Sequence, residues 1–464
     1  LPASSRYGVV RDRQGTVYTA LAEGQNPGDF NFFEASSIRQ VGNKYVMVFS
    51  GYSGPDYGLG STNSALRYAY GDSPLGPWRS GGVLVDSRGV VPNEDGTHLT
   101  TTNFAHNTHG SIEQINGQWY VFYHRPPRGF GNARQAMVAP VKITWDKKKV
   151  ADGGQVRITG YDPYIKGNEW TASASDGTCY TGAEVTSEGF QIYGLPPYAY
   201  YSAGYACYVT GYQWMQDNHD VWSNHMDLAG ITNRGIVGFK YFGFGGLEKG
   251  NKGLPAFDGT RKGDGTTLCL NLTPGGHGAF KIRVMLDGPY ANDTWNGREI
   301  AVVEVPADAP RVATTYSVAV PAVEGLKGKH AIYLVAEGPE VQQPQPRQQQ
   351  WGRQQQPERP VGLFDLHGIG FAKQGKPCER PVVPQVTLMV DGQKLNIPAT
   401  PIRCTNANGL TDAIRYQVYA PLTEGAKLTA TASHPDVQIS VSPIVEGRAT
   451  VTCTYQGNKK IYRY

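Results

Sequence analysis

The chain has 464 residues, of which only 18% are charged, and its formal net charge is +4. This small positive charge is not gathered into a run of lysine and arginine, which argues against a nucleic-acid partner. No apolar stretch approaches the roughly 18 residues of a membrane helix, so no transmembrane segment is predicted. With 58 glycines and 28 tyrosines, the composition favours an all-β protein, and the length predicts two to four domains.

A repeated hairpin pattern occupies residues 1–155. Residues 37–41 and 45–49 are echoed at a constant offset of 74 residues by 111–115 and 119–123, with a polar turn inside each copy. Repeated β-hairpins of this kind predict propeller blades. A shorter echo at residues 9–18 predicts the last strands of an earlier blade. We therefore expect the C-terminal blades of an incomplete β-propeller.

Glu34 opens the first repeat, in the run Phe32-Phe33-Glu34-Ala35. A glutamate at the start of a blade's innermost strand would face the propeller axis, where a ligand binds. Glycoside hydrolysis needs a carboxylic acid that protonates the leaving oxygen, together with a second carboxylate. Apolar neighbours favour the protonated form, so these flanks predict a raised pKa for Glu34 and make Phe33 a candidate substrate contact. The alternative is an exposed loop carboxylate without a catalytic role.

Two further side chains are candidates in this region. His109 opens the second repeat in register with the segment that holds Glu34, so it could bind a metal, a water or a sugar near the axis. Arg134 could reach a sugar hydroxyl or the Glu34 carboxylate. The alternatives are a structural histidine and a surface charge.

Two more β-regions follow. Alternating strands at 280–286, 301–305, 331–335 and 363–366 predict a jelly-roll-like β-sandwich over residues 156–376. A Gln/Pro-rich insertion at 341–359 reads as a flexible loop or a peptide-docking segment. Residues 380–464 predict a small immunoglobulin-like domain, with strands at 385–390 and 449–455.

The six cysteines include no CxxC pair, which gives no support for a zinc site. Spacing leaves three readings open. Cys404 could bridge Cys453, Cys179 could bridge Cys207, or these cysteines could be buried thiols.

Several motifs together resemble glycoside hydrolase family 43. They are FFEASSIR at 32–39, YAYGDSPLGPW at 68–78, NTHGSI at 107–112 and QWYVFYHR at 118–125. The resemblance covers roughly residues 30–145. It implies a five-bladed β-propeller and an inverting hydrolase of arabinose, xylose or galactose linkages. It also implies that Glu34 is the general acid, that Arg134 contacts substrate, and that His109 lies at an axial site that holds calcium or an ordered water.

The second region is similar to the accessory module of some members of that family. The stretches 194–198, 202–208 and 235–242 carry this similarity, and 325–331 resembles part of a family 6 carbohydrate-binding module. Such modules hold sugars on loop aromatics, which makes Trp295 and Tyr290 candidate substrate contacts. Ordinary packing in the loop is the alternative for both.

The chain departs from the family in one respect. The resemblance implies a base aspartate and a pKa-tuning aspartate upstream of the glutamate, yet Asp12 and Asp29 stand in other contexts and are not assigned. We therefore expect a separate N-terminal segment to complete the propeller and carry the base, in a secreted, periplasmic or cell-surface protein that acts on a polysaccharide or oligosaccharide. A non-catalytic polysaccharide-binding protein or a surface-assembly protein is the alternative.

Overall fold

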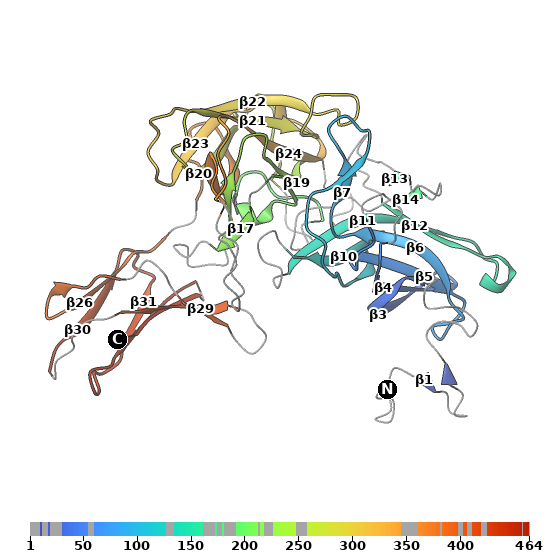
Figure 1. Cartoon of the computed structure of the whole chain (residues 1–464), viewed down its shortest axis with the longest axis horizontal. Coiled ribbons are helices and arrows are strands. Elements are labelled where there is room, and N and C mark those ends of the chain that lie inside the picture. The colour runs from blue at the N-terminus through green and yellow to red at the C-terminus, as the bar shows by residue number, and fades with distance from the viewer. Residues whose placement is uncertain are drawn as a thin grey trace. The chain divides into compact units, whose positions relative to one another are not determined.

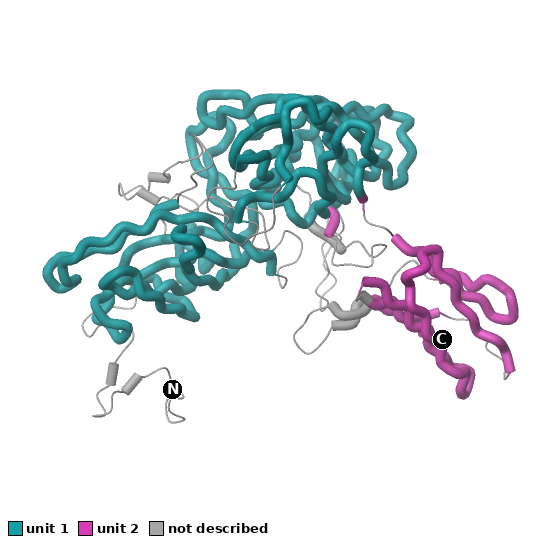
Figure 2. Tube along the Cα trace, turned by 180° about the vertical axis from the view of Figure 1, so that it is seen from behind, with its two compact units in different colours: residues 1–215, 228–379 teal, residues 216–227, 380–464 magenta. Residues whose placement is uncertain are grey.

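The computed structural model describes residues 10–11, 17–18, 30–53, 60–126, 134–160, 172–173, 179–180, 192–211, 214–217, 226–246, 258–344, 360–380, 383–397, 402–405, 411–418, 425–456 and 458–463. These residues form β-strands joined by turns and short 3₁₀ helices, so the all-β prediction is confirmed (Figure 1). The chain divides into two compact units, residues 1–215 with 228–379 and residues 216–227 with 380–464 (Figure 2).

The two predicted repeats form two antiparallel four-stranded sheets. In each sheet the strands are hydrogen-bonded in chain order, which is the meander of a propeller blade, as predicted. Turns that use Gly42 (φ 58°), Asn116 (φ 51°) and Gly117 (φ 85°) join the first two strands of each sheet. The first sheet contains β3 (Phe32–Val41), β4 (Lys44–Gly51), β5 (Ala65–Gly71) and β6 (Arg79–Asp86), and the second contains β9 (Gly110–Ile115), β10 (Gln118–Arg125), β11 (Gln135–Trp145) and β12 (Val156–Gly160).

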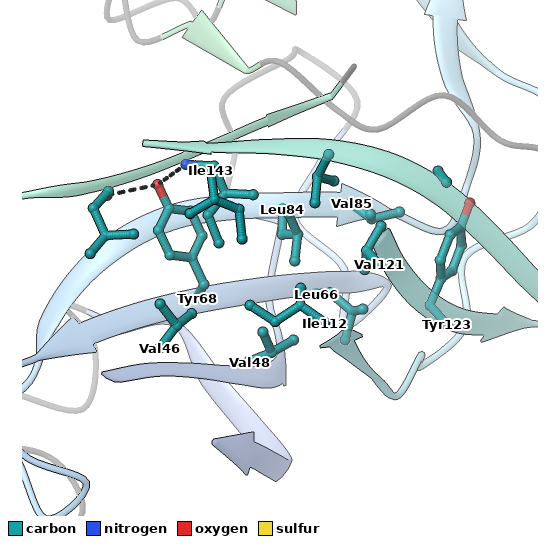
Figure 3. Close-up of a cluster of buried hydrophobic side chains, with 14 of the residues drawn as sticks. Val46, Val48, Leu66, Tyr68, Leu84, Val85, Ile112, Val121, Tyr123 and Ile143 are labelled. Carbon is teal, nitrogen blue, oxygen red and sulfur yellow. Dashed lines mark hydrogen bonds between the residues drawn. The ribbon is translucent and has the colours of Figure 1, made fainter. Parts of the chain in front are cut away.

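One apolar core joins these two sheets. Leu66 and Val48 of the first sheet and Ile112 and Val121 of the second are all at most 1% exposed and belong to the same cluster (Figure 3). Burying a side chain of this size stabilises the fold by about 1.5–3 kcal/mol. The phenol of Tyr68 lies in the same core, where the backbone N–H of Ile158 donates to it. The sheets are therefore held together by side chains that alternate along β-strands.

Polar contacts also fix the first strands of the two sheets against each other. The hydroxyls of Ser37 in β3 and Ser111 in β9 are 2.7 Å apart, and Arg39 forms a 3.0 Å ion pair with Glu113. The offset of 74 residues seen in the sequence is thus the register of β3 against β9.

Short two-stranded ladders accompany the sheets. The predicted hairpin at 9–18 is present as β1 (Val10–Arg11) paired with β2 (Val17–Tyr18), while its place in an earlier blade stays a prediction. The other ladders are β7 (Val90–Pro92) with β8 (Leu99–Thr101) and β13 (Ala172–Ser173) with β14 (Cys179–Tyr180). The 3₁₀ helices are η1 (Val150–Asp152), η2 (Ala203–Tyr205) and η3 (Pro321–Val323).

The predicted sandwich is present in the remainder of the first unit. One sheet runs β18-β25-β20-β23 with β15 also paired to β25, and the other runs β16-β19-β24-β21-β22. Phe280 stacks on Phe364 at 5.1 Å and joins the two sheets. The bounds are β15 (Tyr200–Ser202), β16 (Tyr208–Val209), β18 (Met226–Ile231), β19 (Ile236–Gly245), β20 (Thr267–Pro274), β21 (Phe280–Leu286), β22 (Arg298–Val305), β23 (Thr314–Ala319), β24 (Gly328–Glu337) and β25 (Phe364–Ala372), while β17 (Trp214–Asp217) spans the division between the units.

The second unit contains two sheets around its own core. They run β27-β26-β30 and β28-β29-β33-β32-β31, with β29 and β33 parallel. Val451 and Leu388 lie at the centre of the core. The strands are β26 (Val386–Val390), β27 (Gln393–Lys394), β28 (Ile402–Thr405), β29 (Thr411–Gln417), β30 (Leu428–Ala432), β31 (Gln438–Val441), β32 (Thr450–Tyr455) and β33 (Asn458–Arg463). An immunoglobulin-like identity for this unit stays a prediction, as do the three domain boundaries.

The disulfide in the described residues differs from both pairings that spacing suggested. Cys269 of β20 is bonded to Cys378, whereas Cys207 and Cys453 are buried thiols outside any disulfide. The Cys179–Cys207 and Cys404–Cys453 pairings are therefore wrong. Burial raises the pKa of the Cys453 thiol to about 11. Most of the Gln/Pro-rich insertion, residues 345–359, lies outside the described residues, so both readings of it stay predictions.

Candidate active site

Glu34 lies near the start of β3, where the strand is irregular. It pairs across the sheet with Ser50, and the register shifts on both sides of it, between Phe32 and Glu34 and between Glu34 and Ser36. Ala35 has a φ of 42°, a left-handed conformation that is uncommon for a residue with a Cβ. β-Bulges redirect side chains next to functional sites. Here the Glu34 side chain is left 44% exposed.

The segment before β9 supplies two hydrogen-bond partners for this carboxylate. The Asn107 amide Nδ2 donates to Glu34 Oε1 at 2.8 Å, and His109 Nε2 lies 2.9 Å from the same oxygen. The prediction that His109 lies in register with the segment that holds Glu34 is therefore confirmed. Because both described bonds fall on Oε1, Oε2 is the oxygen that remains available to a substrate.

These bonds lower the pKa of Glu34 below its ordinary value. The largest cause is the hydrogen bond from Asn107, followed by the bond to His109, and burial opposes both only weakly. The expectation of a raised pKa is thus wrong for the described residues. Its physical reason is exposure: Phe32 and Phe33 are 39% and 37% exposed, so they do not shield the carboxylate from water.

His124 of β10 forms a second layer behind His109. Its Nε2 accepts a hydrogen bond from the backbone N–H of His109 at 3.2 Å and lies 3.2 Å from Nδ1 of the His109 ring. Burial, and then the charge of Arg134 and the two neighbouring histidines, lowers the pKa of His124 to about 4. The ring is therefore neutral at pH 7.

The hydrogen bonds of the two rings determine where one proton lies. Since Nε2 of His124 accepts from the backbone, the neutral ring carries its proton on Nδ1. Nε2 of His109 faces Oε1 of Glu34, and the tautomer of the His109 ring decides which of the two donates.

Two exposed aromatic rings contact each other in the first sheet, one of them from the residue before Glu34. Phe33 meets Tyr52 edge-on, with ring centroids 5.7 Å apart, and Tyr52 is itself 38% exposed. Tyr52 is held in place by its backbone, whose carbonyl accepts a 2.9 Å hydrogen bond from the buried Arg67. An exposed, fixed ring of this kind is a suitable surface for the C–H face of a sugar.

The other predicted contacts have different positions. Arg134 is exposed, and its described effect is on the pKa of His124 rather than a hydrogen bond to Glu34. Trp295 is only 8% exposed, and its Nε1 donates to the Asn93 carbonyl, so its prediction as a sugar-stacking residue is wrong and the packing alternative holds. Tyr290 is partly buried against Trp295. Roles for Tyr290, Arg134 and Phe33 in substrate binding stay predictions.

The donors around His109 do not fit calcium. This ion takes six to eight oxygen ligands, whereas the site offers ring nitrogens, one amide and one carboxylate. Within the described ranges, no three His, Cys, Asp or Glu side chains converge as metal ligands would. A metal at His109 therefore stays a prediction, and no chemical step is assigned to it.

Sequence reasoning missed three residues of this site, namely Asn107, His124 and Tyr52. One signal could have found His124. The offset of 74 residues aligns it with Ser50, and Ser50 is the cross-strand partner of Glu34. Asn107 stands two residues before His109 in the NTHGSI motif, which is a signal for it. Tyr52 lies in the loop after β4, where the repeat gives no register.

Comparison with known proteins now adds to this geometry. No protein-family model matches the chain. A curated xylosidase/arabinosidase from Thermoclostridium stercorarium is 24% identical over 66% of this chain and 54% of its own length. Another from Bacteroides ovatus is 27% identical over 33% of this chain and 37% of its own length.

One solved structure is similar to the chain at low sequence identity. The family 43 arabinoxylan arabinofuranohydrolase from Bacillus subtilis is 15% identical, with a TM-score of 0.34, and the match covers 74% of this chain and 55% of that one.

The comparisons support the resemblance that the motifs carry. The chain is similar to curated proteins named xylosidase/arabinosidase. It spans about half the length of the first curated relative that it matches. Among the described residues, no helix has the length and hydrophobicity of a membrane span.

Proposed function

We propose that the protein is a glycoside hydrolase that cleaves arabinose, xylose or galactose linkages in a polysaccharide or oligosaccharide. One observation carries this proposal: the Glu34 carboxylate stands 44% exposed on an irregular first strand, and donors from the neighbouring sheet fix it through a single oxygen. Curated relatives named xylosidase/arabinosidase support the same class of reaction.

In the proposed mechanism, Glu34 is the general acid of a single-displacement, inverting reaction. Asn107 and His109 orient the carboxyl group through Oε1, and Oε2 donates the proton to the departing glycosidic oxygen. An acid must carry its proton when the substrate is bound, which the lowered pKa opposes. Exclusion of water by a bound sugar on Phe33 and Tyr52 would raise this pKa, because desolvation disfavours the carboxylate.

The reaction also needs a base that activates water about 6.5–9.5 Å from the acid. The described hydrogen bonds of Glu34 come from Asn107 and His109 and involve no second carboxylate. We propose that the base aspartate is carried by a separate N-terminal segment that completes the propeller. Exposed side chains along β3 support the idea that further protein packs beside this strand.

We also propose that the protein works outside the cytoplasm, as a secreted, periplasmic or cell-surface protein. The Cys269–Cys378 disulfide supports this placement, because disulfides persist in oxidising compartments and are rare in the cytosol.

A non-catalytic polysaccharide-binding protein is the second candidate, and the lowered pKa of Glu34 favours it. Such a protein would keep the exposed Phe33 and Tyr52 rings as a sugar-binding surface while Glu34 acts only as a hydrogen-bond acceptor. The two functions differ in whether the linkage is broken.

The proposal is tested with the chain purified together with the N-terminal segment proposed to complete its propeller, and with aryl glycosides of arabinofuranose, xylose and galactose. Release of the aryl group is recorded, and proton NMR follows the anomeric configuration of the first sugar formed. We expect release from at least one glycoside with inverted configuration. A retained configuration would overturn the inverting mechanism, and binding of arabinoxylan or galactan without any release would favour the binding protein.

A further inference from the structure

The sandwich is bonded to the blade region at the loop end of the hairpin β10–β11. Arg125 ends β10, Gln135 begins β11, and the two residues are cross-strand partners. Both are buried, at 2% and 7% exposed. Arg125 Nε donates to Gln135 Oε1 at 3.2 Å, so the two side chains form one polar pair across the strands.

The partners of this pair are backbone carbonyls of the sandwich, in the turn that includes η2. Gln135 Nε2 donates to the Gly204 carbonyl at 2.8 Å and to the Ala206 carbonyl at 3.1 Å. Arg125 Nη2 donates to the Cys207 carbonyl. Three hydrogen bonds from two blade side chains therefore converge on one turn of the sandwich.

Further contacts hold the same two parts together. The Cys207 side chain is 1% exposed and belongs to the blade core, while its backbone N–H donates to the Gly238 carbonyl of β19 in the sandwich. Trp295 Nε1 of the sandwich donates to the Asn93 carbonyl of the β7–β8 loop at 3.1 Å. Because buried hydrogen bonds are directional, these contacts fix one arrangement of the sandwich against the blades.

The end of β10 that is fixed in this way carries His124, one residue before Arg125. His124 binds the segment before β9 through its backbone and its ring. Its N–H donates to the His109 carbonyl at 3.3 Å, its carbonyl accepts from the Thr108 hydroxyl, and its Nε2 accepts from the His109 N–H at 3.2 Å. His109 Nε2 in turn lies 2.9 Å from Glu34 Oε1. Two histidines therefore connect the residue bonded to the sandwich with the candidate acid.

Stability alone gives little reason for a buried arginine at this contact. Burying a charged group is costly unless its N–H groups are satisfied, and apolar side chains of similar volume are often equally or more stabilising. Arg125 Nη1 is buried without a hydrogen-bond partner among the described residues. What the polar pair supplies is direction, because its hydrogen bonds fix the end of β10 in one position. Preorganised active sites depend on supporting residues of this kind.

We infer that Arg125 and Gln135 are positioning residues that use the sandwich as a support for the active site. They fix the end of β10, so that His124 keeps His109 against Glu34. Loosening this contact displaces His109 from the carboxylate, and misplaced groups slow the chemical step more than they weaken substrate binding. The inference rests on the proposed function, since it takes Glu34 as the acid.

The test replaces Gln135 by glutamate, which keeps the oxygen that accepts from Arg125 but removes both donors to the sandwich. Gln118→Glu is the matched control, because Gln118 lies at the other end of β10 and its Nε2 donates to the Trp119 and Val141 carbonyls within the blade. Gln135→Met is a second variant, which removes the same donors without adding a charge. Urea unfolding of each variant checks that the fold is kept.

The first readout needs no turnover. Nitrogen NMR of protein with labelled histidine records the backbone amide signal of His109, which is assigned with His109→Gln. Because this N–H donates to His124 Nε2, its chemical shift reports how the two residues lie. We expect the signal to move in both Gln135 variants and to keep its position in Gln118→Glu. A signal that stays in place in the Gln135 variants would overturn the inference.

The second readout is aryl glycoside hydrolysis by the same proteins, each supplied with the proposed N-terminal segment. We expect the Gln135 variants to lower kcat about tenfold or more while KM stays within about twofold, and Gln118→Glu to keep both. The same kcat in Gln135→Glu and Gln118→Glu, or a change in KM alone, would overturn the positioning role. If the unmodified protein hydrolyses no aryl glycoside, the proposed function fails, whereas the His109 signal still decides whether the sandwich contact positions these residues.

Discussion

The first and second sheets of the blade region share one topology, yet they contribute different chemistry. The sheet β3–β6 begins with a bulged strand that carries the Glu34 carboxylate. The sheet β9–β12 is preceded by Asn107, which donates to that carboxylate, and by His109, whose Nε2 lies 2.9 Å from it. Its second strand adds His124. The repeat therefore places two equivalent segments near each other, one at the start of β3 and one before β9. Because these segments differ in sequence, the first supplies the carboxylate and the second supplies its hydrogen-bond partners.

This division makes the site depend on how the two sheets pack. A shared apolar core, the Ser37–Ser111 hydrogen bond and the Arg39–Glu113 ion pair fix the register between β3 and β9. Neither sheet by itself would hold Glu34 within bonding distance of its donors.

The largest expected effect comes from breaking the shared core. Leu66→Ala should lower the free energy of unfolding by about 2–5 kcal/mol, because it leaves a cavity between the sheets. Urea unfolding followed by tryptophan fluorescence measures this change. Ile38→Ala is the matched control, since Ile38 is 38% exposed on β3 and should change the free energy far less. Equal losses for both variants would contradict a core shared by the two sheets.

A second expected effect is a pH dependence of the free energy of unfolding, caused by His124 in the second sheet. The pKa of His124 is lowered to about 4 from its ordinary value of 6.5, so between these values the unfolded chain binds more protons than the folded one. The free energy of unfolding should therefore fall as the pH drops from about 6.5 to 4.

His124→Asn should flatten this pH dependence, whereas the same change at His98, an exposed histidine between β7 and β8, should preserve it. Unfolding at a series of pH values measures the slope. The lowered pKa of Glu34 acts in the same direction, but only below the ordinary value of 4.5. An unchanged slope in His124→Asn would contradict the half-buried, neutral histidine.

A third, smaller effect concerns the pKa of Glu34, which lies in the first sheet and accepts a hydrogen bond from Asn107, just before the second sheet. Asn107→Ala should raise the pKa of Glu34, because its hydrogen bond is the largest cause of the lowered value. Carbon NMR of labelled glutamate carboxyl groups follows the titration. Asn43→Ala is the control, since the Asn43 amide donates to the Lys147 carbonyl instead. A pKa of Glu34 that stays the same in Asn107→Ala would remove the second sheet from this role.

The smallest expected effect is the loss of one hydrogen bond between the first strands. Ser37→Ala should lower the free energy of unfolding by about 0.5–1.5 kcal/mol, since it removes the 2.7 Å contact with Ser111. Urea unfolding gives the value, and Ser111→Ala should give a similar one. If the double variant loses the sum of both single losses, the two hydroxyls do not interact.

Much of the blade region could be predicted from the sequence. Alternating apolar residues and glycine- or asparagine-containing turns indicate the hairpins, and the offset of 74 residues indicates that Glu34 and His109 meet. These signals are local or repetitive, so a single sequence displays them. The same alternation indicates β21 and β24 in the sandwich.

The remaining features depend on contacts between distant segments. The bulge at Ala35, the donation from Asn107 and the exposure of Phe33 together reverse the expected pKa shift of Glu34, and none of them follows from local composition. The Cys269–Cys378 bond closes a separation of 109 residues, which spacing does not specify. The sequence around Trp295 suggests an exposed ring that could stack on a sugar. The Asn93 carbonyl that accepts its hydrogen bond lies far away in the sequence, so local composition does not show this contact.

The central claim is that Glu34 delivers the proton in glycoside cleavage. It is tested most directly by comparing the rate of aryl glycoside hydrolysis in the unmodified protein, in Glu34→Gln and in Glu304→Gln, each supplied with the proposed N-terminal segment. Glu304 of β22 is a matched control because it forms an exposed pair with Lys281 in the sandwich. We expect Glu34→Gln to lower the rate by about 10²–10⁴-fold and Glu304→Gln to keep it within a factor of a few. Similar rates in the unmodified protein and Glu34→Gln would contradict the claim.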